Sequence, residues 1–382
     1  MESRILVGIG HLKRGAGITE LVLKFYTALS QKYGYQIEFI VDTKLPNVVL
    51  PEVPENIKII YAPLLKKSPI KYLQFWKRVS DNADQYVAIH FHIDSLTKFI
   101  PLFLLRKRKN VIIHSHNSMN LRISENKLKT MAHEIGKQIV RKGKFIKFAC
   151  SDTAATWLFD NSQYFQVNNG INLESFRFNY KVRDQIRKKL DIGNSHLYGH
   201  IGRFQYPKNQ IRVVEIFSEI VKMQSNSKLV FIGDGPDEDI VRRRVRELSL
   251  TTQVIFAGYQ ENVPEYLNAI DEIIFPSFYE GLPISLVEAQ ANGVPVLYSD
   301  RITNEIDLLI SSRSFSLNDD DLKIAHAAVS AISKNGSRDN AVAVLENAGY
   351  SLDTVIADLN SFYQQMGHSK DFSGKSIYGV TP

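Results

Sequence analysis

Two glutamates near the end of the chain, Glu280 and Glu288, are separated by seven residues. A helix beginning at Pro283 would leave Glu280 in the preceding loop and place Glu288 about a turn and a half inside the helix. Carboxylates accept hydrogen bonds from sugar and ribose hydroxyls, and N–H groups near Gly281 and Leu282 could hold a phosphate. The spacing therefore fits a nucleotide-sugar site. Two surface glutamates at a helix start fit it equally well.

The elements that would position these carboxylates alternate along the whole chain. Short β-rich runs are separated by stretches long enough for helices, which predicts parallel sheets covered on both faces. In the first half, the predicted strands are residues 4–8, 36–41, 86–91, 110–114 and 145–150, with a helix over 19–31. In the second half, they are residues 200–202, 228–232, 254–256, 272–275 and 294–298, with helices over 182–190, 209–223, 237–248 and 283–291.

The sequence thus predicts an α/β protein with two Rossmann-like, doubly wound domains facing across a cleft. We place the first domain at residues 1–175 and the second at 176–350. A helix in the last stretch, about 351–382, is expected to pack back on the first domain.

Composition excludes several classes of protein. Of 382 residues, 44% are apolar and 23% charged, which is typical of a globular chain and not of a disordered one. The single cysteine, Cys150, excludes a disulfide scaffold and a multi-cysteine metal site. The sequence has no apolar run of about 18 residues and no signal-peptide pattern at its start, so we expect a cytoplasmic protein.

Positive charge is concentrated in the first half of the chain. Residues 101–150 carry 12 basic and 2 acidic side chains, within a net charge of +7 for the whole sequence. This asymmetry predicts an anionic partner, although lysines that only aid solubility are the alternative. Residues 68–81 could form an interfacial helix with Tyr72, Phe75 and Trp76 on one face, or an ordinary core-facing helix. No nucleic-acid-binding module is recognisable, so nucleic acid is not an expected partner.

Five segments, in order along the chain, resemble sequence blocks of the family 4 glycosyltransferases. They are residues 167–176 (VNNGINLESF), 201–209 (IGRFQYPKN), 229–236 (LVFIGDGP), 254–263 (VIFAGYQENV) and 279–289 (YEGLPISLVEA). The last resembles the E-x7-E signature of that family. The resemblance implies the two-domain GT-B fold and retaining transfer from a nucleotide sugar, in which the second domain holds the nucleotide.

The resemblance also implies roles for individual residues. Arg203 and Lys208 would neutralise the donor diphosphate, with a domain-interface carboxylate partner for Arg203 and a solvated Lys208 as the alternatives. Glu288 would accept from the ribose hydroxyls, and Glu280 would hold hydroxyls of the transferred sugar. His116 would reach that sugar from the first domain.

Further donor-binding residues are expected in the loops. The Gly258–Tyr259 backbone would bracket the base, while Gly233 and Gly235 would let the chain approach the nucleotide. Simple turn chemistry is the alternative for these glycines. The other predicted donor contacts are Gly17, Gly202, Gly281, Leu282 and Pro283. Gly17 ends a glycine loop in which the acidic residue, Glu20, comes later than is usual in the family, so its role is open.

Two histidine pairs follow predicted strands, His90 with His92 and His114 with His116. On a strand, both members of such a pair face one side, which could indicate a metal site. Structural histidines are the alternative for His90 and His114. The family is usually independent of metals, so we predict no metal and no cofactor; the nucleotide sugar is a substrate.

The sequence therefore predicts a retaining glycosyltransferase that moves a sugar, from UDP in our prediction, to a hydroxyl of a glycan or lipid-linked acceptor in cell-surface polysaccharide synthesis. The basic first domain indicates peripheral association with an anionic membrane. A homo-oligomer or a partner subunit is compatible with the sequence. The alternatives are a non-catalytic nucleotide-sugar-binding subunit that requires a partner, and an epimerase or phosphorylase with the same fold.

Overall fold

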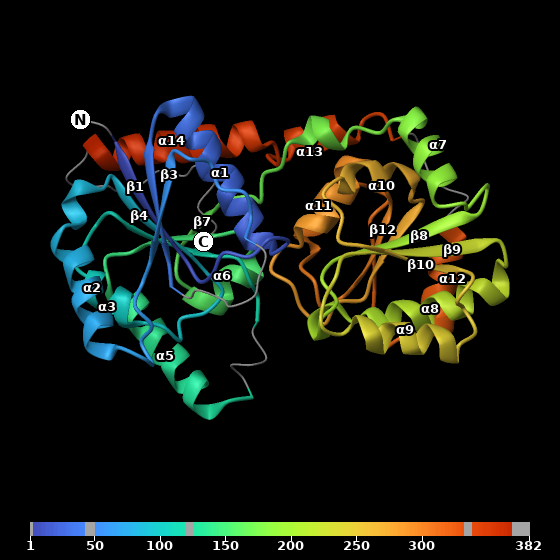
Figure 1. The fold of residues 1–382 in the computed structure, drawn as a ribbon, viewed down its shortest axis with the longest axis horizontal. Helices are drawn as coiled ribbons and strands as arrows, with labels where there is room; N and C mark the ends of the chain where they lie inside the picture. Colours follow the sequence, from blue (N-terminus) through green and yellow to red (C-terminus); the bar gives the residue numbers. More distant parts are fainter. Residues whose placement is uncertain (1–2, 43–49, 120–124, 332–337, 369–382) are drawn as a thin grey trace. The chain divides into compact units, whose positions relative to one another are not determined.

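The computed structural model describes residues 3–42, 50–119, 125–331 and 338–368. The chain forms two compact units (Figure 1). The first unit comprises Met1–Gly170 with Leu352–Pro382, and the second comprises Ile171–Ser351. The units divide between Gly170 and Ile171, a few residues before the predicted boundary. Residues 369–382, at the end of the predicted C-terminal segment, lie outside the described residues.

In its described residues, the first unit contains one parallel sheet in the order β3-β2-β1-β4-β5-β6-β7. The strands are β1 Arg4–Ile9, β2 Gln36–Val41, β3 Ile57–Tyr61, β4 Ala88–Ile93, β5 Val111–Ser115, β6 Ile146–Ala149 and β7 Phe165–Gln166. The central strands are nearly continuous apolar runs because helices cover both faces of the sheet. Strand β3, which we did not predict, is at an edge and is partly exposed, which weakens its apolar signal.

The helices of the first unit lie on the two faces of this sheet (Figure 1). α1 (Gly17–Tyr33) packs beside α14 (Leu352–His368), so the end of the chain returns to the first unit. On the other face, α2 (Pro69–Asp81), α3 (Ile100–Leu105), α5 (Lys127–Lys142) and α6 (Asp152–Phe159) follow one another. A short 3-10 helix, η1 (Ala83–Gln85), precedes β4.

The second unit repeats this scheme with a parallel sheet in the order β10-β9-β8-β11-β12-β13. Its strands are β8 His196–Ile201, β9 Ser227–Ile232, β10 Val254–Gly258, β11 Glu272–Phe275, β12 Val296–Ser299 and β13 Arg313–Phe315. The helices are α7 Tyr180–Lys189, α8 Gln210–Met223, α9 Glu238–Glu247, α10 Val263–Ala269, α11 Ile284–Ala291, α12 Asp321–Ala331 and α13 Ala341–Asn347. The 3-10 helices are η2 Leu173–Phe176, η3 Tyr206–Lys208 and η4 Asn304–Ile306. The α/β fold class with two Rossmann-like domains is confirmed.

The burial of side chains in residues 68–81 distinguishes the interfacial helix from the core-facing helix. Helix α2 buries Tyr72 and Trp76 completely and leaves Ile70 exposed. Its aromatic face therefore belongs to the core, and the core-facing alternative is correct. Among the described helices, none combines the length and apolar character needed to cross a bilayer.

Candidate active site

The predicted donor-binding residues of the second unit gather at one edge of its sheet. Gly202 follows β8, Gly233 follows β9, and Gly258 ends β10. Glu280 lies in the loop after β11. These four strands are neighbours and run parallel, so their carboxyl ends meet at this edge. Ligands of doubly wound sheets bind at this position.

Close contact between backbones explains two of the loop glycines. A Cβ atom at Gly233 would lie 2.2 Å from the carbonyl oxygen of Gly202, and one at Gly235 would lie 2.2 Å from that of Phe204. The Gly233 N–H also donates to the Gly258 carbonyl at 2.8 Å. Both glycines thus let the loop after β9 pack on the loop after β8. This packing alone requires glycine at both positions, whether or not a nucleotide approaches them.

Lys208 and Glu280 form an ion pair with 2.7 Å between Nζ and Oε1. Their side chains are only 15% and 17% exposed, so the pair is largely removed from water. The ammonium also lies 4.8 Å from the centre of the Phe275 ring. The sequence assigned Lys208 to the donor diphosphate and Glu280 to the transferred sugar, which are adjoining parts of the donor. The structure brings them together, and Lys208 is not the solvated lysine of the alternative interpretation.

The loops that carry this ion pair are tied to each other through backbone groups. The Phe278 N–H donates to the Pro207 carbonyl at 2.9 Å, and the Asn209 side-chain amide donates to the Pro276 carbonyl at 3.0 Å. Asn209 has a φ of 54°, which turns the chain from η3 into α8. The exposed rings of Tyr206 and Phe278 stack at 4.9 Å between centroids. Sequence analysis singled out neither aromatic residue.

Arg203 lies near the pair but is more exposed. Its guanidinium is 3.4 Å from Asp234 Oδ1, with the side chains 31% and 62% exposed. The structure therefore gives Arg203 a carboxylate partner, but Asp234 belongs to the same unit and is not the domain-interface carboxylate of the alternative interpretation. Exposed ion pairs contribute about 0–1 kcal/mol, so Arg203 can exchange Asp234 for a phosphate at little cost.

The remaining predicted donor contacts of the second unit lie in, or just beyond, the loops at this edge. Pro283 caps α11, so the helix begins one residue later than predicted, at Ile284. Glu288 is half-buried on α11, Leu282 is buried, and the Tyr259 ring is 39% exposed. Gly281 lies in the loop between Glu280 and the helix.

His200, at the end of β8, is a buried group of this site that sequence analysis missed. One ring nitrogen, Nδ1, donates to the Ile274 carbonyl at 2.9 Å, and the ring stacks on Phe275. Burial and, to a lesser extent, the charge of Lys208 lower the pKa of His200 to about 4, although the hydrogen bond to Ile274 acts in the opposite direction. The imidazole is thus neutral beside the lysine. Its position two residues before Gly202 was the available signal, because residues i and i+2 face one side of a strand.

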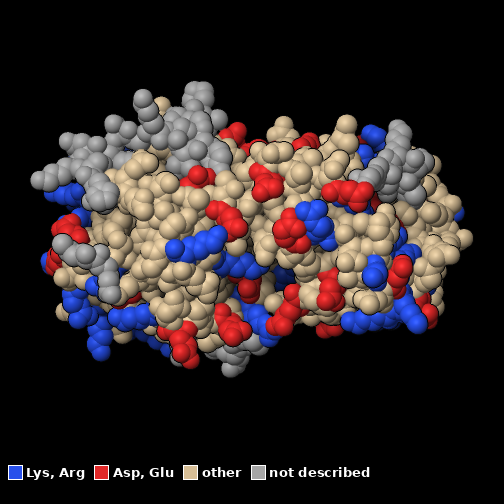
Figure 2. Space-filling view, turned by 90° about the horizontal axis from the view of Figure 1, so that it is seen from above, with Lys and Arg blue, Asp and Glu red and all other residues tan. Residues whose placement is uncertain are grey.

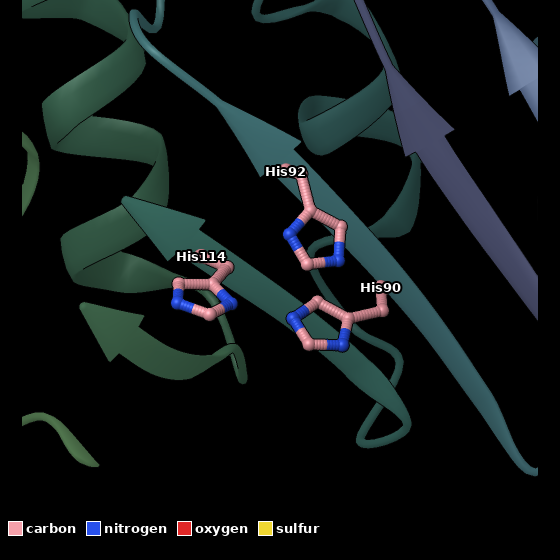
Figure 3. Close-up of side chains that lie close together, drawn as sticks. All are labelled: His90, His92 and His114. Carbon is pink, nitrogen blue, oxygen red and sulfur yellow. The ribbon is translucent and has the colours of Figure 1, made fainter. Parts of the chain in front are cut away.

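In the first unit, both histidine pairs lie on one side of β4 and β5. Figure 3 shows three of these residues, His90, His92 and His114. His92 and His114 are directly opposite each other in the register of the two strands. Burial lowers the pKa of His90, His92 and His114 well below the usual value, and that of His116 to about 3. The four rings are therefore neutral at physiological pH.

His90, His92 and His114 have ring nitrogens within 4.8 Å of one another, which makes them a candidate metal site. However, His92 already uses both nitrogens in hydrogen bonds, to Tyr26 and to His116. Structural zinc sites have four ligands, whereas this group, within the described residues, offers three. The donor set fits a resident metal poorly, and the absence of a metal remains our prediction.

Near the start of α1, Glu20 has a structural role. Its carboxylate accepts from the Gly15 N–H at 2.9 Å, and Gly15 has a φ of 73°. Glu20 thereby closes the glycine loop that leads to Gly17, the first residue of α1. The later position of this glutamate is explained, since it lies one helical turn inside α1 and reaches back to the loop.

Comparison with known proteins identifies the class. Residues 182–335 match the family model of glycosyl transferases group 1. The chain is 27% identical over 315 residues to the putative glycosyltransferase EpsF of Bacillus subtilis, covering 80% of this chain and 81% of that protein. It is 24% identical over 321 residues to the capsular polysaccharide biosynthesis glycosyltransferase CapH of Staphylococcus aureus, covering 81% and 84%. The crystal structure of HepE from Anabaena with UDP superposes with a TM-score of 0.74 at 14% identity, covering 96% of this chain and all of that one.

The two parallel sheets and these matches define a transferase of the GT-B fold. The chain is a glycosyltransferase, and its resemblance to the family 4 glycosyltransferases is confirmed.

Proposed function

We propose that the protein is a retaining glycosyltransferase that moves a sugar from a UDP-sugar to a hydroxyl of a glycan or lipid-linked acceptor. The observation that carries this proposal is the Lys208–Glu280 ion pair at the carboxyl ends of the second sheet. This pair places a cation beside a carboxylate. A diphosphate needs the cation, and the hydroxyls of the sugar bonded to it need the carboxylate. The UDP in the HepE structure supports the choice of donor, and CapH supports a role in polysaccharide synthesis.

The reaction needs charge stabilisation on the leaving group. As the bond to the sugar breaks, negative charge builds on the diphosphate, where Lys208 and Arg203 would neutralise it. Glu280 would accept from sugar hydroxyls and stabilise positive charge at the anomeric carbon. A diphosphate oxygen would take the proton of the incoming acceptor hydroxyl on the same face, as the family resemblance implies. Since two side-chain cations serve the phosphates, we propose that no metal or cofactor takes part.

Nucleotide release from a panel of UDP-, GDP- and ADP-sugars tests this proposal. We expect release from a UDP-sugar that rises with membrane lipid extract, survives EDTA and collapses at least a hundredfold in Glu280→Gln. The exposed surface variant Glu247→Gln is the matched control and should retain full activity.

Other outcomes of this experiment would identify the alternatives. Nucleotide binding without release under any condition would support the non-catalytic subunit. A changed sugar nucleotide without transfer would indicate an epimerase, and a requirement for free phosphate would indicate a phosphorylase. Loss of activity on removal of metal would contradict a cofactor-free reaction.

We further propose that the protein works at the cytoplasmic face of an anionic membrane and docks through α5. This helix leaves Leu128, Met131 and Ile135 exposed at 75%, 58% and 41%, on one face. Exposed basic residues lie at both ends of this stripe, Lys127 and Lys129 at its start and Arg141, Lys142 and Lys144 beyond its end, with one exposed acidic residue, Glu134, between them. The face of the molecule shown in Figure 2, by contrast, carries charges of both signs side by side. An apolar stripe among lysines complements an anionic lipid surface.

Vesicle binding tests this surface. Vesicles containing anionic lipid are expected to bind the protein in a salt-sensitive way, and the double variant Leu128→Asp/Met131→Asp should weaken binding by roughly tenfold or more. Ile240→Asp, which changes a similarly exposed apolar residue on α9, is the control and should bind normally. Equal binding to neutral and anionic vesicles would contradict the proposal.

A further inference from the structure

A chain of hydrogen bonds runs through the interior of the first unit. The Nε2 atom of His116 lies 2.8 Å from Nδ1 of His92, whose other ring nitrogen lies 3.0 Å from the Tyr26 hydroxyl. That hydroxyl lies 3.1 Å from the hydroxyl of Tyr363, which lies 2.7 Å from Nδ1 of His90. The chain therefore connects the predicted donor-sugar contact, His116, with the C-terminal helix α14. His90 and His92 stand on the same strand (Figure 3).

Burial sets the protonation state of every member. Tyr26, Tyr363 and His90 are 0% exposed, His92 is 2% exposed, and His116 is 8% exposed. Desolvation lowers the pKa of each histidine and raises the pKa of both tyrosines. Each imidazole therefore carries one proton, and each phenol keeps its own. A neutral imidazole that donates from one nitrogen accepts at the other, and a phenol that accepted at both of its links would leave its own buried O–H unpaired, so all links point in the same direction along the chain.

Only two directions satisfy this condition. In one, His116 donates from Nε2, and the chain ends with a buried His90 Nε2–H that faces no acceptor among the described residues. In the other, His90 donates from Nδ1, and each group donates onward until His92 donates to Nε2 of His116. The second direction leaves only a lone pair at His90 and places the terminal N–H on Nδ1 of His116, beside the Asn169 side chain. Orphaned buried N–H groups are the rarer of the two in proteins.

The second direction also fixes the tautomer of His116. Its Nε2 accepts from His92, so its proton is on Nδ1. Burial lowers the pKa of His116, and the Asn169 side chain partly offsets this by favouring a proton on the ring, although Nδ1 makes no hydrogen bond of normal length and angle with a described residue. Because Nε2 is occupied by His92, Nδ1 is the nitrogen available for Asn169. A proton on Nδ1 of His116, where the Asn169 side chain favours it, is what the second direction of the hydrogen-bond chain requires.

We propose that Tyr26 and Tyr363 are positioning residues, which act through His92 to hold His116 in its Nδ1–H tautomer and in a fixed ring orientation. The proposal rests on the proposed function for the contact of His116 with the donor sugar. It gives the returning helix α14 a task beyond packing, because α14 supplies the Tyr363 hydroxyl. Neither tyrosine touches the substrate in this role.

The test is 15N NMR of histidine side chains in the full-length protein, with His116 assigned from a His116→Gln variant. We expect wild-type His116 to show the Nδ1–H tautomer. Tyr26→Phe should give a mixture of His116 tautomers and lower kcat by about tenfold. In metal sites, loss of the partner that orients a histidine costs about 10- to 100-fold, and we expect the lower end of that range. Tyr363→Phe should have a smaller effect, since the Tyr26 hydroxyl can still donate to His92.

Tyr35→Phe is the matched control. Tyr35 is buried, its hydroxyl donates to Asn360 of α14 at 2.9 Å, and its ring packs on Tyr363, but it is not part of the chain. It should leave the His116 spectrum and kcat unchanged, while thermal unfolding shows that all three variants fold. An Nε2–H tautomer in the wild type, or equal spectra for Tyr26→Phe and Tyr35→Phe, would overturn the proposal. The spectra need no substrate, so they decide it even if the protein transfers no sugar.

Discussion

Replacing Lys208 with methionine is expected to lower kcat for sugar transfer by about 100- to 1000-fold, the range found when one group stabilising transition-state charge is removed. Methionine keeps much of the side-chain volume and removes only the cation. The effect should be far larger than that of Lys222→Met, which changes an exposed lysine of the same unit. Steady-state kinetics with the preferred donor measures both variants.

The ion pair complicates a single substitution, because Lys208→Met leaves Glu280 largely buried without its cation. Breaking a buried pair from one side typically costs about 3–5 kcal/mol of stability. The double variant Lys208→Met/Glu280→Gln removes both charges, so it should recover much of the stability while remaining inactive. If activity recovered together with stability, the role of Lys208 would be structural, and our assignment would be wrong.

Mild acid is expected to destabilise the first unit strongly. His90, His92, His114 and His116 have folded-state pKa values below the usual 6.5, so between about pH 3 and 6.5 the unfolded chain binds more protons than the folded one. Stability therefore falls as the pH drops below 6.5. At pH 5.5, one unit below the unfolded value, the four groups together should cost on the order of 5 kcal/mol, which is comparable to the stability of a typical domain.

Tryptophan fluorescence is the appropriate probe, because the only two tryptophans of the sequence, Trp76 and Trp157, both lie in the first unit. Urea unfolding at pH 7.5 and 5.5 should show a much lower midpoint at the acidic pH. His114→Leu should reduce this difference without breaking a hydrogen bond to any described residue. His326→Gln, at an exposed position of the second unit, should leave it unchanged. Equal midpoints at the two pH values would contradict the buried, neutral state of the cluster.

The sequence alone determined the fold class and predicted where the donor binds. Apolar runs such as β2 and β11 have the predicted bounds, since strands buried on both faces leave a clear signal. Edge strand β3 left no such signal, because only one of its five side chains is buried. The order of motifs placed Gly202, Gly233, Gly258 and Glu280 at the ends of strands, and parallel pairing then brings those ends together.

Only the tertiary structure decided which of these residues contact one another. Local pattern could not pair Lys208 with Glu280, because the two loops meet only through the register of β8 and β11. Nor could it join His92 to Tyr26 and Tyr363, since Tyr26 and Tyr363 are 337 positions apart and meet only when α14 packs beside α1. Periodicity reports the face on which a side chain lies. The partner it finds there depends on long-range packing, and so do its charge, its tautomer and its chemistry.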